Sequence, residues 1–254
     1  MQRKRPTAQD YSTYTGKDFY VWRLLYERQL PSIQAHASQL YLDALDKIGF
    51  NANEIPNFDK TNKRLQQHTG WQLAVVPGLV PEGAFFEMLA NKTFPATCWL
   101  RSLEEMDYIE EPDIFHDVLG HVPLLVNSAY AMFLHNFGKL AMKWMDTPNA
   151  IHILAHVYWF TIEFGLLREN GKNKIFGAAI ISSHGEMENV YKADTHKIPF
   201  NIREMFSTEH NFSNYQSKYF VLDSFEQLCH ALPQIDKQLE QILSTQLIDE
   251  TIDK

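Results

Sequence analysis

Two histidines spaced five residues apart are the side chains in this sequence that most favour metal chemistry. His116 and His121 follow Pro112, a residue that fits the first turn of a helix. A straight α-helix would set the two imidazoles about 140° apart around its axis, too far to face one ion. Gly120 is typical of a position just past a helix end. We therefore expect the helix to break at Gly120 and the chain to fold His121 back beside His116.

A glutamate in an apolar segment is the third candidate ligand. Glu163 lies within the sequence YWFTIEFGL, and burying a lone carboxylate costs several kcal/mol unless it is paired or binds a cation. From this pattern alone, a hydrogen bond to a neighbouring helix explains Glu163 equally well. Two neutral imidazoles and one carboxylate would hold a divalent ion on one face and leave about three positions open, as in the non-haem Fe(II) oxygenases.

His152 and His156 form a competing pair at the i, i+4 spacing of helical zinc sites. Ile153 occupies the position at which the HExxH motif has its glutamate. Glu163 lies seven residues beyond His156, about 10 Å along a helix axis, and so cannot share an ion with the pair. We favour two polar or packing histidines here, with a zinc hydrolase as the alternative.

Arg101 and Ser182 each allow two interpretations. Taken alone, Arg101 is best explained by a surface ion pair with Glu104 or Glu105, although beside a metal site it could grip a substrate carboxylate with both arms of its guanidinium. Ser182 is either a turn residue or a side chain that fixes a histidine through its second ring nitrogen.

The elements that must position these residues are mainly α-helices with a few short β-strands. Apolar periodicity and capping residues predict helices, and alternating or β-branched runs predict strands. Helices are expected at 17–30, 32–48, 59–68, 81–90, 112–119, 128–145, 149–168, 224–231 and 233–247, and strands at 71–76, 94–100, 174–181 and 219–222. We find no repeat or linker and expect one domain over residues 1–254.

Composition excludes several classes of protein. The chain has 254 residues, 45% of them hydrophobic, and a formal net charge of −8, which fits a globular protein and argues against nucleic acid as a partner. The sequence contains no window of 18 apolar residues, so we predict no membrane span. Cys98 and Cys229 are the only cysteines, so we expect a reducing, cytoplasmic location. No GxGxxG, GxxxxGK[ST] or GxSxG motif is present.

Five segments in consistent order resemble the tetrahydropterin-dependent aromatic amino acid hydroxylases. The segment EPDIFHDVLGHVPL (111–124) resembles the iron-binding signature of this family, and YWFTIEFGL (158–166) and FGAAIISSHGE (176–186) resemble two further motifs. Residues 71–80 are similar to its strand and pterin loop, and residues 215–225 to its C-terminal YFV-x-SF region. The likeness covers roughly residues 17–232.

The resemblance implies a role for each matching residue. His116, His121 and Glu163 would bind Fe(II), and Arg101 would hold the carboxylate of the amino acid substrate, with Ser182 near that group and supporting His116. The remaining implied residues are Pro112, Trp159 and Phe164 around the substrate ring, and Gly78, Leu79, Val80, Phe85 and Glu111 around the tetrahydropterin. We expect Glu111 and Ser182 to take part in catalysis.

The implied activity is hydroxylation of L-phenylalanine to L-tyrosine by a cytoplasmic monooxygenase that uses Fe(II), a tetrahydropterin and O₂. Hydroxylation of tryptophan or tyrosine is the alternative within the family, and a non-catalytic helical binding module is the alternative outside it. An apolar residue near Phe212 favours phenylalanine over tyrosine. We expect no regulatory domain or tetramerisation helix, no nucleic acid or membrane partner, and a monomer or homodimer.

The sequence also departs from the family pattern at several positions. Phe176 replaces a tyrosine, Ala179 replaces a glycine, and Ile109 and Glu110 stand where animal members have Thr-Pro. Because that threonine helps to hold the polar end of the substrate, Arg101 would have to do more of this work here.

Overall fold

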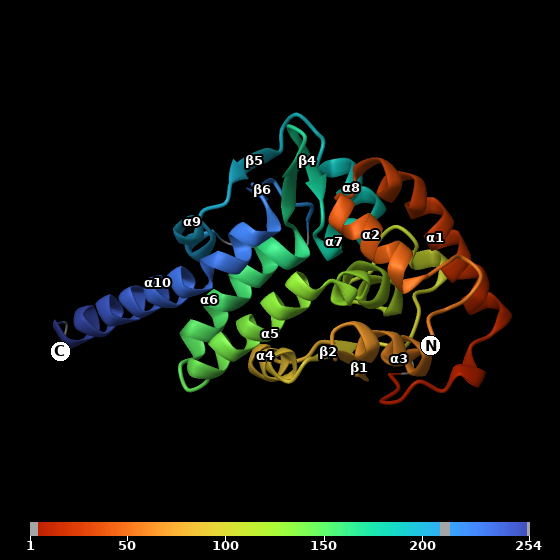
Figure 1. The fold of residues 1–254 in the computed structure, drawn as a ribbon, viewed down its shortest axis with the longest axis horizontal. Helices are drawn as coiled ribbons and strands as arrows, with labels where there is room; N and C mark the ends of the chain where they lie inside the picture. The colour runs from red at the N-terminus through yellow and green to blue at the C-terminus, as the bar shows by residue number, and fades with distance from the viewer. Residues whose placement is uncertain (1–4, 209–213, 253–254) are drawn as a thin grey trace.

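Three helices form the N-terminal part of the chain, on the right of Figure 1. The computed structural model describes residues 5–208 and 214–252, so the region near Phe212 lies outside the described residues. The three helices are α1 (Gly16–His36), α2 (Gln39–Ile48) and α3 (Phe58–His68). Helix α1 begins at a capping box made by Thr15 and Asp18, in which each residue satisfies a backbone N–H of the other.

The predicted end of the first helix at Pro31 is wrong. Helix α1 continues through Pro31 to His36, and α2 begins after its cap Ser38 instead of at the predicted residue 32. A proline within a helix costs about 3 kcal/mol. The buried residues of α1 lie on both sides of the proline, from Val21 to Ile33, so burial of this apolar face offsets that cost.

A small parallel sheet lies below the central helices in Figure 1. Strand β1 (Gln72–Val75) pairs with β2 (Thr93–Ala96), and helix α4 (Glu82–Ala90) connects them. Because the strands are parallel, their carboxyl ends lie at the same edge, and the residues that follow each strand come together there. This edge carries residues 76–80 after β1 and residues 97–101 after β2.

A second sheet of four strands has the order β4-β3-β6-β5. Strands β3 (Leu166–Glu169) and β4 (Lys172–Ile175) form an antiparallel hairpin, while β6 (Lys218–Leu222) is parallel to both β3 and β5 (His196–Pro199). The helix predicted at 149–168 and the strand predicted at 174–181 are therefore each wrong over part of their length. Helix α6 ends at Tyr158, and the chain becomes extended at Leu166.

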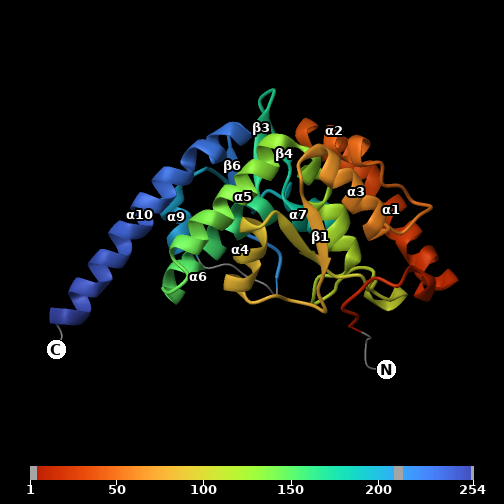
Figure 2. The ribbon, with the colours of Figure 1, turned by 60° about the horizontal axis from the view of Figure 1, so that its bottom comes forward.

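Helices α5 (Ser128–Lys143) and α6 (Pro148–Tyr158) run through the centre of the molecule, with α10 (Phe225–Ile252) beside them (Figure 1). The sequence predicts a break at Pro233, but α10 is continuous through it. Its first half packs against the body, with Ile235 and Leu239 fully buried. Its second half projects away from the rest of the chain (Figure 2).

Short elements complete the fold, and two of them contain the candidate metal ligands. They are the helices α7 (Ala178–Ser182), α8 (His184–Asn189) and α9 (Ile202–Ser207), the 3₁₀ turns Tyr11–Thr13, Leu103–Glu105 and Pro123–Val126, and the π-helices Phe115–His121 and Trp159–Glu163. The mainly helical class with a few short strands is confirmed.

One large hydrophobic core joins the helices and both sheets. Trp22, Tyr41, Trp71 and Tyr130 are among its fully buried large side chains. Within the described ranges, no single helix is long and apolar enough to cross a membrane. The segments Phe115–Val126 and Ser128–Lys143 reach that length only as a pair, bent by 110°.

Candidate active site

A π-helix brings His116 and His121 together. Residues Phe115–His121 form this π-helix, in which backbone hydrogen bonds run from residue i+5 to residue i instead of from i+4. The wider turn places residues five apart above one another, and the two imidazole centroids are 5.2 Å apart. The spacing that is unfavourable in an α-helix is therefore the one that a π-helix aligns.

The predicted helix break at Gly120 is wrong. Gly120 lies inside the π-helix and is buried. Its role is close packing, since a Cβ at this position would lie 2.9 Å from the Ala178 carbonyl oxygen and 3.1 Å from Ala178 Cβ in α7. Only a residue without a side chain allows the two helices to approach this closely.

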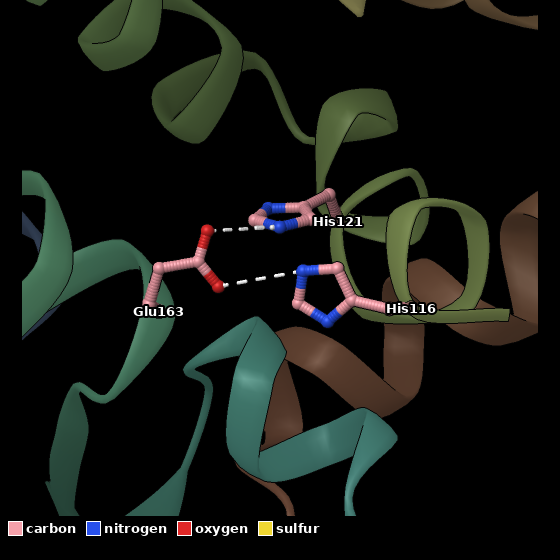
Figure 3. A group of neighbouring side chains, drawn as sticks. All are labelled: His116, His121 and Glu163. Atoms are coloured by element: carbon pink, nitrogen blue, oxygen red, sulfur yellow. Dashed lines mark ion pairs between the residues drawn. The ribbon is translucent and has the colours of Figure 1, made fainter. Parts of the chain in front are cut away.

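Glu163 faces both histidines from the end of a second π-helix, Trp159–Glu163 (Figure 3). Its Oε1 is 3.1 Å from His121 Nε2, and its Oε2 is 3.8 Å from His116 Nε2. Glu163 Oε2 is buried and has no hydrogen-bond partner among the described residues. The three side chains point at a common space from segments more than forty residues apart in the sequence.

This donor set fits a divalent metal ion. One donor atom from each of His116, His121 and Glu163 lies within 4.8 Å of the others, and no other group of three such residues is found in the described part of the chain. An ion at the common space would satisfy the orphaned carboxylate oxygen. Two imidazoles and one carboxylate on one face define the non-haem Fe(II) class of centre.

Ser182 fixes the tautomer of His116. The Ser182 hydroxyl donates to the Ala178 carbonyl oxygen at 3.0 Å and lies 2.8 Å from His116 Nδ1. Because its only proton is used for Ala178, Ser182 accepts from His116, so the imidazole proton sits on Nδ1. The lone pair of Nε2 is then directed at the space beside Glu163, the arrangement expected of a metal ligand.

Burial keeps His116 neutral at physiological pH. Desolvation is the largest influence and lowers the pKa of His116 to about 4. For Glu163, burial is the largest single influence and acts to raise the pKa, but the His121 and His116 imidazoles and a backbone hydrogen bond from Ala179 together outweigh it, so the net shift is downward. A neutral imidazole and an ionised carboxylate are the states that bind a metal.

All the site residues predicted from the sequence line one pocket of about 650 Å³. The metal-binding candidates lie in its wall together with the residues implied for substrate and pterin. The predicted residues in the lining are Gly78, Leu79, Val80, Phe85, Arg101, Glu111, Pro112, His116, His121, Trp159, Glu163, Phe164 and Ser182. The fold thus gathers residues from the carboxyl edge of the small sheet, from α4 and from both π-helices into one cavity.

Arg101 is buried and does not make the surface ion pair with Glu104 or Glu105 that its local sequence favours. Its Nε and Nη2 each lie 2.8 Å from a carboxylate oxygen of Asp113. Asp113 is fully buried and also accepts from the backbone N–H groups of Arg101 and His116. Arg101 Nη1 has no hydrogen bond with any described residue, and Arg101 lines the pocket. This geometry suits recognition of an anionic group, with Asp113 holding the guanidinium in place.

The loop after β1 and helix α4 also contribute to the pocket wall. Phe85 contacts Tyr158 edge-to-face with ring centroids 4.9 Å apart. Gly78, Leu79 and Val80 form the adjoining part of the wall, and Leu79 is 76% exposed. An exposed apolar side chain beside an aromatic ring offers a surface on which a flat ring can stack.

A buried polar network that the sequence does not predict supports the substrate side. The hydroxyl of Tyr219 and the backbone N–H of Gln216 both donate to Glu186 Oε1. Gln216 in turn accepts from Trp159 Nε1 at 3.4 Å, and Trp159 packs on Phe164 with centroids 4.7 Å apart. In the sequence, Ser183 and Glu186 have the spacing of a capping box. That spacing predicts the start of α8 and gives no indication of this network.

The competing pair lies apart from this triad. His152 and His156 have ring centroids 4.7 Å apart, and His152 Nδ1 is 3.3 Å from Glu82 Oε1. The side chains of His152 and Glu82 are 55% and 45% exposed. They do not form a compact group of three donors within the described residues, so a zinc site is not supported here.

Comparison with known proteins agrees with the site. The family model for biopterin-dependent aromatic amino acid hydroxylase matches residues 4–251. A phenylalanine-4-hydroxylase of Ralstonia nicotianae is 42% identical over 221 residues, which is 86% of this chain and 70% of that protein. One from Chromobacterium violaceum is 38% identical over 226 residues, covering 88% and 75% of the two chains. The chain therefore belongs to the biopterin-dependent aromatic amino acid hydroxylases, as its motifs predict.

Solved structures of the Chromobacterium violaceum phenylalanine hydroxylase share the fold. One with bound Fe(III) has a TM-score of 0.88 and 38% identity, and the alignment covers 93% of this chain and 86% of that one. A second contains iron(III) and oxidised 7,8-dihydrobiopterin, with a TM-score of 0.87, 37% identity and coverage of 93% and 85%. The fold prediction is confirmed at the level of the whole catalytic domain.

Proposed function

We propose that this protein is an Fe(II)- and tetrahydropterin-dependent monooxygenase that converts L-phenylalanine to L-tyrosine with O₂. The observation that carries the proposal is the triad of His116, His121 and Glu163 in the wall of a pocket large enough for an amino acid and a pterin. Membership of the family and the named activity of its relatives support the substrate. A cytoplasmic location and a monomeric or homodimeric state remain predictions from the sequence.

The triad would hold Fe(II) through His116 Nε2, His121 Nε2 and the carboxylate of Glu163. Three ligands on one face leave the other positions open to the pocket. When bound, the iron and the reduced pterin supply the electrons that activate O₂ for insertion into the aromatic ring. The protein contributes the position of each reactant and a site shielded from water.

Arg101 would bind the carboxylate of phenylalanine through its unoccupied Nη1. Its ion pair with Asp113 fixes the guanidinium plane before the substrate arrives, which reduces the entropy lost on binding. Pro112, Trp159 and Phe164 then contact the substrate ring from the pocket wall. Because the polar end is held by Arg101, the far end of the ring is directed toward the metal triad.

The pterin would lie between Phe85, the loop Gly78–Val80 and Glu111, all of which line the pocket. Stacking on Phe85 and backbone contacts from the loop need no charged motif, which explains why no short phosphate or nucleotide fingerprint is present in the sequence. Glu111 offers carboxylate oxygens to the N–H groups of the pterin ring.

The test is an assay of the purified protein with Fe(II), tetrahydropterin, O₂ and phenylalanine, scored for tyrosine by chromatography. We expect tyrosine to form and to depend on all four components. Replacing His116 with alanine should abolish both iron binding and tyrosine formation. The matched change His156→Ala, in the competing pair, should leave iron stoichiometry unchanged and activity within about threefold.

Two outcomes would contradict the proposal. Iron binding without tyrosine formation would remove phenylalanine as the substrate, and the same assay with tryptophan or tyrosine would then test the alternatives within the family. Zinc binding that is lost in His156→Ala and kept in His116→Ala, with no tyrosine formed, would instead favour the zinc hydrolase.

A further inference from the structure

The side chain of Arg5 lies over the loop that follows β1. Its Nη1 donates to Glu111 Oε2 in a short ion pair and is 3.4 Å from the Pro77 carbonyl oxygen. Its guanidinium carbon is 5.9 Å from the centroid of the Trp99 ring. One guanidinium therefore contacts three segments that are far apart in the sequence.

Two of these three segments are hydrogen-bonded to each other, and two contribute to the wall of the pocket. Trp99 Nε1 donates to the Pro77 carbonyl oxygen at 3.3 Å. A Cβ at Gly78 would lie 2.6 Å from Arg5 Nη1, so the guanidinium packs directly on the backbone of the loop. Gly78 and Glu111 both line the pocket.

The backbone that carries Arg5 is anchored to the body by nearby residues. The Gln9 side chain donates to the Pro56 carbonyl oxygen at 3.0 Å and accepts from the Phe58 backbone N–H at 2.7 Å. Cys98 Sγ lies 3.7 Å from the Ala8 carbonyl oxygen. Only three residues separate Arg5 from Gln9, so these contacts restrict the space that Arg5 can sample.

The ion pair is too exposed to matter much for folding. The side chains of Arg5 and Glu111 are 41% and 33% exposed, and pairs of this kind contribute about 0–1 kcal/mol. The contact is more important for the position of Glu111. A long, partly exposed carboxylate side chain has several rotamers, and fixing one of them before a ligand arrives lowers the entropy lost on binding.

We infer that Arg5 is a positioning residue for the pterin, acting by fixing the Glu111 carboxylate and tying the loop after β1 to the segment that carries Glu111. This inference rests on the proposed function, because it assigns Glu111 and Gly78 to the pterin side of the pocket. Arg5 does not contact the metal triad or the Arg101–Asp113 pair in any described interaction, so we expect its effect to be largest on the pterin.

The test compares Arg5→Gln with the wild type in calorimetric titrations of the iron-loaded protein with 7,8-dihydrobiopterin. We expect the dissociation constant to rise about fivefold, the range of a lost exposed ion pair. Arg5→Lys keeps the charge but not the forked geometry and should recover part of this loss. In turnover, KM for the tetrahydropterin should rise while KM for phenylalanine and the iron affinity stay within about twofold.

Salt and a matched variant separate this role from a general effect. Raising the ionic strength should weaken dihydrobiopterin binding by the wild type and have a smaller effect on Arg5→Gln, because salt screens exposed pairs. Arg168→Gln removes another exposed ion pair, the one with Asp223 at 3.4 Å, in β3 away from the pocket. Its dihydrobiopterin affinity should equal that of the wild type.

The inference would be overturned if Arg5→Gln bound dihydrobiopterin as tightly as the wild type does. It would also be overturned if Arg5→Gln bound more tightly, because Arg5 would then obstruct the site. A parallel loss in Arg168→Gln would also overturn it. Failure of the proposed function gives a different result, in which the wild-type protein itself binds no dihydrobiopterin and makes no tyrosine.

Discussion

The tautomer of His116 is set by a chain of two hydrogen bonds. The Ala178 carbonyl accepts the Ser182 proton, and Ser182 accepts from His116 Nδ1. The position of a proton on one ring nitrogen therefore depends on a backbone carbonyl in α7. The residue types alone do not reveal this dependence, because a serine in the sequence SSHGE is equally expected to be a turn or cap residue.

Replacing Ser182 with alanine should lower iron affinity by about 10- to 100-fold, the range measured for lost partners of metal-binding histidines. Without the serine oxygen, His116 Nδ1 loses its acceptor and the imidazole is free to rotate. Affinity can be measured by Fe(II) competition with a chelator of known strength.

The adjacent serine provides the control. Ser183 caps α8 by accepting from the Glu186 backbone N–H at 3.2 Å, and loss of such a cap costs about 1 kcal/mol of stability. Ser183→Ala should therefore have a lower free energy of unfolding than the wild type, and an iron affinity within about twofold of the wild-type value. Equal losses of affinity in both variants would show that Ser182 acts only through local stability.

Two π-helical segments place all three candidate ligands. His116 and His121 lie at the two ends of one such segment, and Glu163 lies at the end of the other. Each π-helical segment packs closely against a neighbouring segment, because a glycine lies at the contact. A Cβ at Gly177 would lie 2.5 Å from the Glu163 carbonyl oxygen, as one at Gly120 would press on Ala178. The geometry of the triad is therefore a property of packed elements.

Gly120→Val should lower iron affinity by about tenfold or more and destabilise the protein by about 1–3 kcal/mol, the usual cost of overpacking a core. The valine must displace α7, which carries Ser182, so both His121 and the acceptor of His116 are disturbed. Iron titration and urea unfolding measure the two effects.

Gly16→Val is the matched change, because a Cβ at Gly16 meets no atom within 4 Å. It should leave iron affinity unchanged. Wild-type iron affinity in Gly120→Val would show that the contact with Ala178 does not determine the geometry of the triad.

At the scale of the whole molecule, Glu186 links distant parts of the fold. It lies on α8, is 4% exposed, and accepts from Tyr219 in β6 and from the Gln216 backbone. Burial raises the pKa of Glu186, and the hydrogen bonds from Tyr219 and Gln216 offset this only in part. An ionised carboxylate at this position therefore costs the folded state free energy.

The free energy of unfolding of Glu186→Gln, relative to the wild type, should increase between pH 4 and pH 7. A carboxyl whose pKa is raised in the folded state stabilises the fold at low pH, and this contribution is lost as the pH rises through the folded pKa. Glutamine stays neutral, so it escapes this loss. Urea unfolding of the iron-free protein at both pH values measures the difference.

Tyr219→Phe removes a hydrogen bond that lowers the pKa of Glu186, so its stability should fall more steeply with rising pH than that of the wild type. If the free energy of unfolding of Glu186→Gln exceeded that of the wild type by more at pH 4 than at pH 7, the upward shift assigned to the pKa of Glu186 would be wrong.

The helical class, the family and thirteen of the residues that line the pocket could be predicted from the sequence. The motifs around His116, Glu163 and Ser182 are long and occur in a fixed order, and a segment with its apolar side chains at helical spacing must bury that face whatever its neighbours are. Local signals also placed the helices at 59–68, 81–90 and 128–145 to within two residues at each end. They failed at Pro31 and Pro233, where packing on both sides of the proline outweighs the lost hydrogen bond.

Only the tertiary structure decided which partners these residues meet. The π-helical turn that aligns His116 with His121, the Asp113 carboxylate that holds Arg101, and the approach of Arg5 to Glu111 are not predicted by any local pattern. The physical reason is that such contacts depend on how separate elements pack, and Arg5 and Glu111 are 106 residues apart. The sequence supplied the chemical groups of the site, and packing set their distances, protonation states and orientation.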